Sequence, residues 1–443
     1  MVSAPLNPAS GDRPSGSPAT KVPRWFHVMV KPAGSGCNLD CKYCYYLHKD
    51  KLLSLPEFKR ITPEALETFI RSYIEATHQS EIVFTWQGGE PTLLGLDFFH
   101  QVVELQRKHT PPGKHIANDL QTNGLLLDDE WCAFLRQNNF LVGLSIDGPK
   151  HLHDEFRVTR GGQPTFDRVM AAVKRLKAHK IKFNTLTVIH RHNVKYPLDI
   201  YRFLTRELDS PTIQFIPCVE PKSFERVAPG HWDAASMPVV GSPAARPGSP
   251  DSVVTDWSVD PDDFGEFLCK CFDEWHSRDL GKRMVAWFEN SVGLWMGLPS
   301  QMCVFSDICG KGVALERDGG LYSCDHFVYP EYRLGNIQDT PMADLVFSER
   351  QLQFGRNKSD SLPRYCRECK YLFACHGECP KNRFVRTPDG EPGLNYLCPG
   401  LKRFFAHADE RLRDIAAQCA ARTPGIPLDR NPDSQRSDVH ALS

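Results

Sequence analysis

The spacing of the cysteines constrains this chain more than any other feature. Of the sixteen cysteines in 443 residues, eleven fall into groups of three, three and five. The groups are Cys37, Cys41 and Cys44; Cys303, Cys309 and Cys324; and Cys366, Cys369, Cys375, Cys379 and Cys398. Three neighbouring thiolates can bind three irons of a [4Fe–4S] cluster and leave the fourth iron open. The eight later cysteines are the number that two fully ligated clusters need.

A zinc site is the alternative for the first group, which has the spacing C-x3-C-x2-C. Structural zinc takes four tetrahedral ligands, usually from two C-x2-C pairs. Here three thiolates are clustered, and His48 is a nearby candidate for a fourth ligand. The aromatic Tyr43 before the last cysteine, and a β/α pattern that begins at this loop, favour the iron–sulfur cluster.

Composition excludes several classes of function. The 53 basic and 54 acidic residues nearly balance, so we expect no nucleic-acid partner and no basic membrane patch. No apolar run is long enough to span a bilayer. Residues 1–22 are a polar leader that we expect to be disordered, and they do not resemble a secretory signal. We therefore expect a cytoplasmic protein, in which cysteines bind metal rather than form disulfides, and we take a monomer as the default.

Residues 23–256 alternate between strand-like and helix-like segments. Strands are expected at 25–30, 82–86, 116–120, 141–146, 182–189 and 212–216, and helices from Thr62 and at 96–108, 128–137, 165–179 and 197–208. This alternation predicts an α/β fold with a parallel sheet, closed into a full or partial barrel. The polar and Gly-rich motifs follow the strand ends, where such barrels build their active sites.

The remaining segments complete the expected organisation. Residues 224–256 form a Pro/Gly-rich loop of the barrel domain. Residues 257–421 contain a linker helix at 261–279, the cysteine-rich region and a C-terminal helix at 404–421, and residues 422–443 form a disordered tail. Five cysteines outside the three groups fall in expected helices or a strand, and we interpret them as small core residues. They are Cys132, Cys218, Cys269, Cys271 and Cys419.

The first cysteine run resembles the signature of the radical S-adenosylmethionine (SAM) superfamily. This resemblance implies that the open iron binds SAM, which is cleaved to methionine and a 5′-deoxyadenosyl radical. The turn Gly88-Gly89-Glu90-Pro91 follows at the family's spacing; its glycines allow close backbone approach, and Glu90 could receive the SAM ammonium. Taken alone, this turn would be a tight βα turn with a capping acid. By resemblance the SAM-binding positions are Tyr43, Gly89, Ser145, Arg157 and Ile216.

The later cysteines resemble the SPASM extension of radical SAM enzymes that mature peptides and proteins. The resemblance implies a partial parallel (β/α)6 barrel followed by a SPASM-type domain with two auxiliary [4Fe–4S] clusters, three clusters in all. By position, auxiliary cluster I takes Cys303, Cys309, Cys324 and Cys379, and auxiliary cluster II takes Cys366, Cys369, Cys375 and Cys398. Such clusters transfer electrons, and support of folding is the alternative role. Zinc ribbons are the alternative for the cysteines themselves.

Further motifs resemble the anaerobic sulfatase-maturating enzymes. They are QGGEPT (87–92), QTNG (121–124), SIDGP (145–149), QFIPC (214–218), YSCD (322–325) and YRLGN (332–336), within a resemblance that spans residues 28–405. These enzymes oxidise a Cys or Ser of a sulfatase precursor to Cα-formylglycine. The resemblance implies that the radical removes a Cβ hydrogen, that Asp325 is the base, and that an auxiliary cluster takes the second electron.

The same resemblance implies two partners. One is an unfolded sulfatase precursor peptide with the pattern Cys/Ser-x-Pro/Ala-x-Arg, which Tyr46 and Gln87 are candidates to contact. The other is a flavodoxin- or ferredoxin-type reductant. Two alternatives stay open: another SPASM peptide maturase, which makes thioether or carbon–carbon crosslinks, and a zinc-stabilised module without enzymatic activity. The sequence does not decide between Cys and Ser as target.

Overall fold

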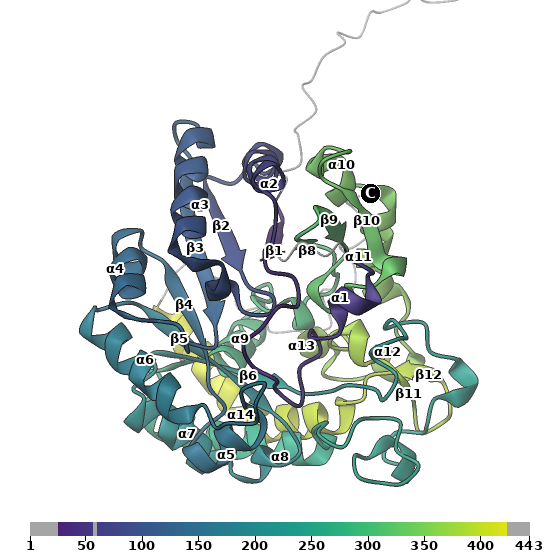
Figure 1. Cartoon of the computed structure of the whole chain (residues 1–443). Helices are drawn as coiled ribbons and strands as arrows, with labels where there is room; N and C mark the ends of the chain where they lie inside the picture. Colours follow the sequence, from purple (N-terminus) through teal and green to yellow (C-terminus); the bar gives the residue numbers. More distant parts are fainter. Residues whose placement is uncertain (1–24, 56–59, 423–443) are drawn as a thin grey trace, which may run out of the picture.

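The structure is a computed structural model that describes residues 25–55 and 60–422. The expected leader at 1–22 lies outside the described residues, as does the expected tail apart from residue 422. All described residues belong to one assembly of a curved sheet with helices on its outside and a C-terminal part beside it (Figure 1).

One ten-stranded sheet organises the molecule, in the order β10-β9-β8-β1-β2-β3-β4-β5-β6-β7. The strands are β1 (His27–Lys31), β2 (Glu81–Trp86), β3 (His115–Thr122), β4 (Leu141–Ser145), β5 (Phe183–Ile189), β6 (Thr212–Pro217), β7 (Met284–Val285), β8 (Gly312–Glu316), β9 (Gly320–Tyr322) and β10 (Arg333–Asn336). A separate pair joins β11 (Val385–Arg386) and β12 (Pro392–Leu394). All neighbours from β8 to β7 pair in parallel, so the expected mostly parallel α/β sheet is confirmed.

Helices connect the parallel strands, cover the sheet and form much of the C-terminal part. They are α1 (Lys49–Leu52), α2 (Pro63–Ala76), α3 (Gly95–His109), α4 (Asp129–Gln137), α5 (Lys150–Phe156), α6 (Phe166–Ala178), α7 (Pro197–Arg202), α8 (Pro261–Glu274), α9 (Ala286–Trp295), α10 (Met342–Val346), α11 (Glu349–Asp360), α12 (Arg364–Arg367), α13 (Leu372–Cys375) and α14 (Cys398–Arg422). The Thr62 side chain caps α2 by accepting from the Ala65 amide at 3.2 Å, with Pro63 at the first helical position. The expected start of this helix is therefore confirmed.

Three helices differ from the sequence expectation at their ends. The helix expected at 197–208 is α-helical to Arg202 and continues as a π-helical turn, Phe203–Glu207. The helix expected at 261–279 ends likewise in a π turn, Trp275–Asp279. The last helix begins at Cys398, six residues before the expected 404. Helix ends depend on tertiary packing, so sequence periodicity places them less well than helix centres.

The barrel core follows the alternation of buried residues along the strands. On β2, Ile82, Phe84 and Trp86 are buried, while the residues between them are more exposed. Phe84 and Trp86 pack edge-on against Phe69 of α2. Each such side chain contributes about 1.5–3 kcal/mol on burial. Four of the five cysteines expected in the core are buried, whereas Cys419 is partly exposed against the core.

The C-terminal part is joined to the barrel through its sheet. Strand β8 pairs in parallel with β1 from His27↔Gly312 to Lys31↔Glu316, and β9 and β10 add antiparallel strands beyond it. This extension places the turn after β9, which carries Asp325, beside the end of β1. The cysteine loop after β1 therefore lies between the barrel and the C-terminal part (Figure 1).

The linker helix α8 and the last helix α14 cross at two glycines. A Cβ atom on Gly400 would lie 2.0 Å from the Pro261 carbonyl oxygen, and one on Gly265 would lie 2.6 Å from the Gly400 Cα. Only glycine allows the helix backbones to approach this closely. The crossing attaches the C-terminal helix to the barrel side of the molecule. Among the described helices, none is both long and apolar enough for a membrane crossing.

Candidate functional site

The first cysteine loop connects β1 to α1 and carries three free thiols, Cys37, Cys41 and Cys44. Burial raises the pKa of Cys37 to about 11, of Cys41 to about 12 and of Cys44 to about 11. The three thiols also interact electrostatically with one another. Their Sγ donors and their shared loop fit an iron–sulfur cluster, whose irons would replace the thiol protons.

The Gly88–Glu90 turn packs directly on this loop through its backbone. The Gly89 amide donates to the Gly34 carbonyl at 2.8 Å, and the Glu90 amide donates to the Gly36 carbonyl at 2.8 Å. A Cβ atom on Gly89 would lie 2.0 Å from the Gly36 carbonyl oxygen. Glycine is required at this position because the two backbones touch.

The Glu90 carboxylate joins the ends of two barrel strands. Its Oε1 accepts from the Thr92 amide at 3.0 Å, the Thr92 hydroxyl at 2.6 Å and the Thr122 hydroxyl at 2.8 Å. Its Oε2 accepts from the Asn123 amide at 2.8 Å, and burial raises the pKa of the carboxyl. Four protein donors thus hold Glu90, and a contact with the SAM ammonium stays a prediction.

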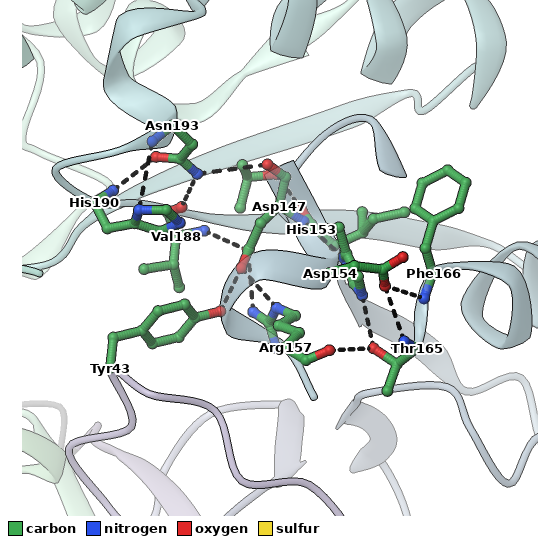
Figure 2. A network of polar contacts seen from close by, with 12 residues as sticks. Tyr43, Asp147, His153, Asp154, Arg157, Thr165, Phe166, Val188, His190 and Asn193 are labelled. Atoms are coloured by element: carbon green, nitrogen blue, oxygen red, sulfur yellow. Dashed lines mark hydrogen bonds and ion pairs between the residues drawn. The ribbon is translucent and has the colours of Figure 1, made fainter. Parts of the chain in front are cut away.

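On the barrel side of the loop, two of the predicted SAM-binding residues donate hydrogen bonds to Asp147 (Figure 2). The Tyr43 hydroxyl donates to Oδ2, and Arg157 donates from Nε to Oδ2 at 2.8 Å and from Nη2 to Oδ1 at 3.2 Å. The Val188 amide donates to Oδ1 at 3.0 Å. Burial alone would raise the pKa of Asp147, but the Arg157 guanidinium brings it below its usual value. Sequence reasoning gave Asp147 no role, although it lies inside the SIDGP motif.

The other predicted SAM positions lie around this network. Ser145 ends β4, two residues before Asp147, and is buried. Ile216 on β6 is partly buried and pairs with Val188, which packs with Tyr43. The structure therefore brings Tyr43, Arg157, Ser145 and Ile216 to one region, with Gly89 at the cysteine loop.

On the opposite side of the loop, Asp325 forms a second buried pair. Lys31 Nζ lies 2.5 Å from Asp325 Oδ1 as an ion pair without hydrogen-bond alignment, and the Tyr45 hydroxyl donates to Oδ2 at 2.6 Å. Burial would raise the pKa of Asp325, but Lys31 keeps it below the usual value, so the carboxylate is ionised. Lys31 is 1% exposed and Asp325 is 8% exposed. Lys31 and Tyr45 are functional candidates that the sequence gave no reason to single out.

Two further residues lie beside this pair. Tyr46 is buried, its hydroxyl donates to Glu316, and Lys31 Nζ lies 4.6 Å from the centre of its ring. Burial raises the pKa of Glu316 to about 8, although Lys31 opposes the rise. Gln87, at the end of β2, is partly exposed. Peptide contacts of Tyr46 and Gln87 stay predictions.

The later cysteines gather into two sets. Burial, and then the nearby Cys303 and Cys379 thiols, raise the pKa of Cys324. Burial also raises the pKa of Cys379, followed by the effects of Glu378 and of the Cys309 and Cys303 thiols. In the second set the pKa of Cys398 is raised by burial and then by the Cys375, Cys366 and Cys369 thiols. The grouping is the same as in the sets expected for auxiliary clusters I and II, and the binding of clusters by these sets stays a prediction. Within residues 25–55 and 60–422, no three His, Cys, Asp or Glu side chains converge on a single-ion site.

Buried cations hold the loops that carry these cysteines. Lys358 is fully buried and donates to the Cys303 and Val304 carbonyls at 2.8 and 2.9 Å. Arg383 donates to the Gly377 carbonyl at 3.0 Å and to the Lys358 carbonyl at 2.6 Å. Between Cys375 and Cys379, the residues His376, Gly377 and Glu378 have φ of +46°, +70° and +48°. The left-handed conformation is costly for His376 and Glu378, which are not glycines, and such residues are often found at functional sites.

Two family descriptions match the chain. The Radical SAM superfamily matches residues 32–204, and the SPASM iron-sulfur cluster-binding domain matches residues 307–370. The first match spans the barrel from the cysteine loop into α7, and the second covers β8 to β10 and part of the later cysteines. The radical SAM fold with a C-terminal SPASM region, expected from the sequence, is confirmed.

Relatives of named activity match most of the chain. It is 45% identical to the serine-type anaerobic sulfatase-maturating enzyme of Bacteroides thetaiotaomicron, over 86% of this chain and 89% of that protein. It is 34% identical to the cysteine-type enzyme of Clostridium perfringens, over 88% and 98%. The structure of native anSMEcpe with bound AdoMet and Cp18Cys peptide covers 89% of this chain and 99% of that one, with a TM-score of 0.75 and 33% identity.

Proposed function

The chain belongs to the anaerobic sulfatase-maturating enzymes of the radical SAM superfamily, and we propose that it oxidises a serine or cysteine of a sulfatase precursor to Cα-formylglycine. One observation carries the proposal. The first cysteine loop holds Tyr43 and Tyr45 two residues apart, and each donates to a different buried aspartate, Asp147 or Asp325. The loop thus separates a SAM-binding side from a side that carries a base.

Three [4Fe–4S] clusters complete the enzyme. The first is held by Cys37, Cys41 and Cys44; auxiliary cluster I by Cys303, Cys309, Cys324 and Cys379; and auxiliary cluster II by Cys366, Cys369, Cys375 and Cys398. When bound, the clusters and SAM supply a 5′-deoxyadenosyl radical that removes the Cβ hydrogen and an acceptor for the second electron. The thiol groupings support this assignment because each set interacts within itself.

SAM binds on the barrel side of the loop. The residues that hold it are Tyr43, Gly89, Ser145, Arg157 and Ile216. Asp147 fixes the Tyr43 hydroxyl and the Arg157 guanidinium, so both side chains are positioned before the cofactor arrives. Gly89 keeps the adjacent turn in contact with the cysteine loop.

Asp325 is the base on the other side. It accepts the hydroxyl or thiol proton of the target, because its carboxylate is ionised and retains a small exposed area. Lys31 and Tyr45 fix both of its oxygens. Since Cys324 precedes it, the proton and the second electron leave the substrate at neighbouring positions. A serine gives the aldehyde directly, and a cysteine gives a thioaldehyde that water hydrolyses.

The substrate is an unfolded sulfatase precursor peptide with the pattern Cys/Ser-x-Pro/Ala-x-Arg. The peptide-bound structure of anSMEcpe, similar over most of this chain, supports a peptide substrate. The reductant is a flavodoxin or ferredoxin, and the enzyme acts as a cytoplasmic monomer. A reductant of low potential is needed because SAM cleavage consumes an electron at the first cluster.

Mass spectrometry of peptides tests the function. Peptides with C-x-P-x-R and S-x-P-x-R are incubated anaerobically with the reconstituted enzyme, SAM and dithionite. We expect an aldehyde at the target residue and a matching amount of 5′-deoxyadenosine. Deoxyadenosine with unchanged peptides would move the assignment to another SPASM maturase. If a protein loaded with about twelve irons forms no deoxyadenosine, the assignment as a radical SAM enzyme is overturned.

A further inference from the structure

Lys49 is a buried cation that the reaction described above does not use. It begins α1, directly after the cysteine loop, and its amide donates to the Tyr46 carbonyl at 3.0 Å. The side chain is 1% exposed. Its Nζ lies 3.3 Å from the centre of the Tyr329 ring, and the Tyr329 hydroxyl is bound to the Phe224 carbonyl at 2.5 Å. A buried ammonium is costly unless it is paired.

The two carboxylates with the strongest electrostatic effect on the Lys49 ammonium already form ion pairs with other lysines. Glu220 pairs with Lys381 at 2.8 Å, and Asp325 pairs with Lys31 at 2.5 Å. Over residues 25–55 and 60–422, no ion pair within 4.0 Å involves Lys49. An ammonium has three donors, and a ring face satisfies it only in part. Lys49 therefore retains donors for a group that arrives from outside the chain.

Lys49 faces the same side of the loop as the base. Tyr329 follows Asp325 by four residues, and the field of Asp325 reaches the Lys49 ammonium. In Figure 1, α1 lies against the C-terminal part rather than among the barrel helices, and the ion pair between Asp50 and Arg317 at 2.5 Å fixes it there. The free donors of Lys49 and the carboxylate of Asp325 thus lie on the same side of the cysteine loop.

We propose that the Lys49 ammonium donates a hydrogen bond to the oxygen of the target side chain, and that this contact makes serine the preferred target. The inference rests on the proposed function. In the serine reaction the Cβ hydrogen leaves as an atom to the deoxyadenosyl radical, the hydroxyl proton passes to Asp325, and one electron leaves to an auxiliary cluster. The C–O bond becomes C=O, and Lys49 stabilises the negative charge that develops on the oxygen.

The same contact favours cysteine far less. A sulfur atom is a weak hydrogen-bond acceptor, so it gains little from an ammonium. A thiol ionises near pKa 8.5, whereas an aliphatic hydroxyl is a much weaker acid and needs more help to lose its proton. A site that supplies a hydrogen bond to a substrate oxygen discriminates against an analogue that cannot use it. Lys49 is thus a specificity residue for the known type of reaction.

Direct competition between two peptides measures this preference. The peptides are identical apart from Ser or Cys at the target, and the cysteine peptide carries a heavy-isotope arginine because both give the same aldehyde. The ratio of initial rates is measured for the wild type, Lys49→Leu, Lys49→Arg and the control Lys51→Leu. Lys51 lies in the same helix but is exposed to solvent. Iron content and the absorption spectrum establish that each variant holds its clusters.

We expect Lys49→Leu to slow serine oxidation by about 10- to 100-fold and cysteine oxidation by less than about threefold. Lys49→Arg restores part of the ratio because it keeps a charged donor. Lys51→Leu leaves both rates unchanged. Equilibrium binding of each peptide with SAM but without reductant gives a second readout, in which Lys49→Leu weakens the serine peptide alone.

Equal loss of both activities would overturn the proposal, because a structural role for Lys49 would not distinguish the two targets. An unchanged ratio would do the same. If the wild type oxidises neither peptide, the proposed function fails, and the binding ratio then decides on Lys49 by itself. If Lys49→Leu fails to retain iron, Lys49→Gln replaces it, since its amide fills the space with a weaker donor.

Discussion

Two buried aspartates flank the first cysteine loop, and they are held in different ways. Asp147, on the barrel side, is fully buried and receives four hydrogen bonds, two of them from the Arg157 guanidinium. Asp325, on the side of the C-terminal part, is 8% exposed and is held by Tyr45 and by the single ammonium of Lys31. Arginine binds a carboxylate through a planar fork, whereas lysine is a point charge.

The difference separates a scaffold from a reactive group. The bonds of Asp147 leave it little freedom, and its negative charge fixes the orientation of the Arg157 guanidinium. Asp325 keeps its charge but has fewer bonds, which suits the proposed base because it can exchange a partner for the substrate proton. Tyr43 lies in a turn and Tyr45 in the bend that follows, and each donates its hydroxyl to the aspartate on a different side of the loop.

The largest expected effect is on the base. Asp325→Asn should lower the rate of formylglycine formation by about 10²- to 10⁴-fold, because an amide cannot accept the target proton. Deoxyadenosine should still form, since the proposed SAM positions lie on the other side of the loop. Mass spectrometry of the peptide and chromatography of deoxyadenosine, on the same samples, measure the two events separately.

A control for Asp325→Asn is Asp339→Asn, which changes an exposed carboxylate of the same part of the chain. It should leave both products at the level of the wild type. If Asp325→Asn keeps normal formylglycine formation, another group is the base. If it abolishes deoxyadenosine as well, Asp325 belongs to the scaffold, and the contrast with Asp147 disappears.

The second effect is on stability. Asp147→Asn should lower the free energy of unfolding by about 3–5 kcal/mol, because the buried Arg157 then lacks its counter-charge. The loss should exceed that of Asp325→Asn in parallel urea titrations of the cluster-loaded proteins. Asp167→Asn, an exposed change on α6, is the matched control. Equal losses in the two aspartate variants would show that both act as structural pairs.

The two tyrosines allow a finer comparison. Tyr43→Phe and Tyr45→Phe each remove one hydroxyl that donates to an ionised carboxylate, a bond of about 1.5–3 kcal/mol. The loss in Tyr43→Phe should be seen in stability and in SAM affinity. In Tyr45→Phe it should be seen in the rate of peptide oxidation, with SAM affinity unchanged. Isothermal titration with SAM and single-turnover kinetics of peptide oxidation distinguish the two variants. Equal losses of SAM affinity and of rate in both would contradict the assignment of the two tyrosines to different sides of the loop.

Local patterns in the sequence predicted much of this fold. The strands β1 to β6 alternate with helices, so hydrophobic period and turn residues were sufficient to place them within a few residues. The cysteine spacing predicted three groups along the sequence, whereas the two auxiliary sets came from the resemblance, because Cys379 is grouped with Cys303, Cys309 and Cys324 from a separate loop. The turn at Gly88 and Gly89 was also predicted, since its glycines mark close backbone contact.

The charge pairs could not be predicted in this way. Lys31 ends a strand and would ordinarily be a solvated lysine; it is buried because β8 pairs with β1 from far along the chain. Asp147 and Arg157 lay within or near known motifs, but their mutual contact depends on how α5 turns back onto β4. Lys49 gave no signal at all, because its environment is assembled from Tyr329 and other distant residues.

The smallest effect is a pH dependence on the side of the base, where Lys49 adds a cation. Burial lowers the pKa of Lys49 to about 7, with Lys381 acting in the same direction, and Glu220, Asp325 and Glu331 oppose the shift. Lys49 is therefore charged below about pH 7 and loses its proton above it. If the ammonium selects serine, the ratio of serine to cysteine oxidation should fall about tenfold between about pH 6 and pH 8.5.

Part of that fall belongs to the substrate, because a thiol also becomes more reactive as pH approaches its own pKa near 8.5. Lys49→Arg separates the two contributions, since its guanidinium stays charged throughout this range. In Lys49→Arg the ratio of serine to cysteine oxidation should decline with pH only because the thiol becomes more reactive. The additional decline in the wild type then measures the loss of the proton from Lys49. Parallel slopes in the two proteins would mean that Lys49 does not titrate in contact with the target.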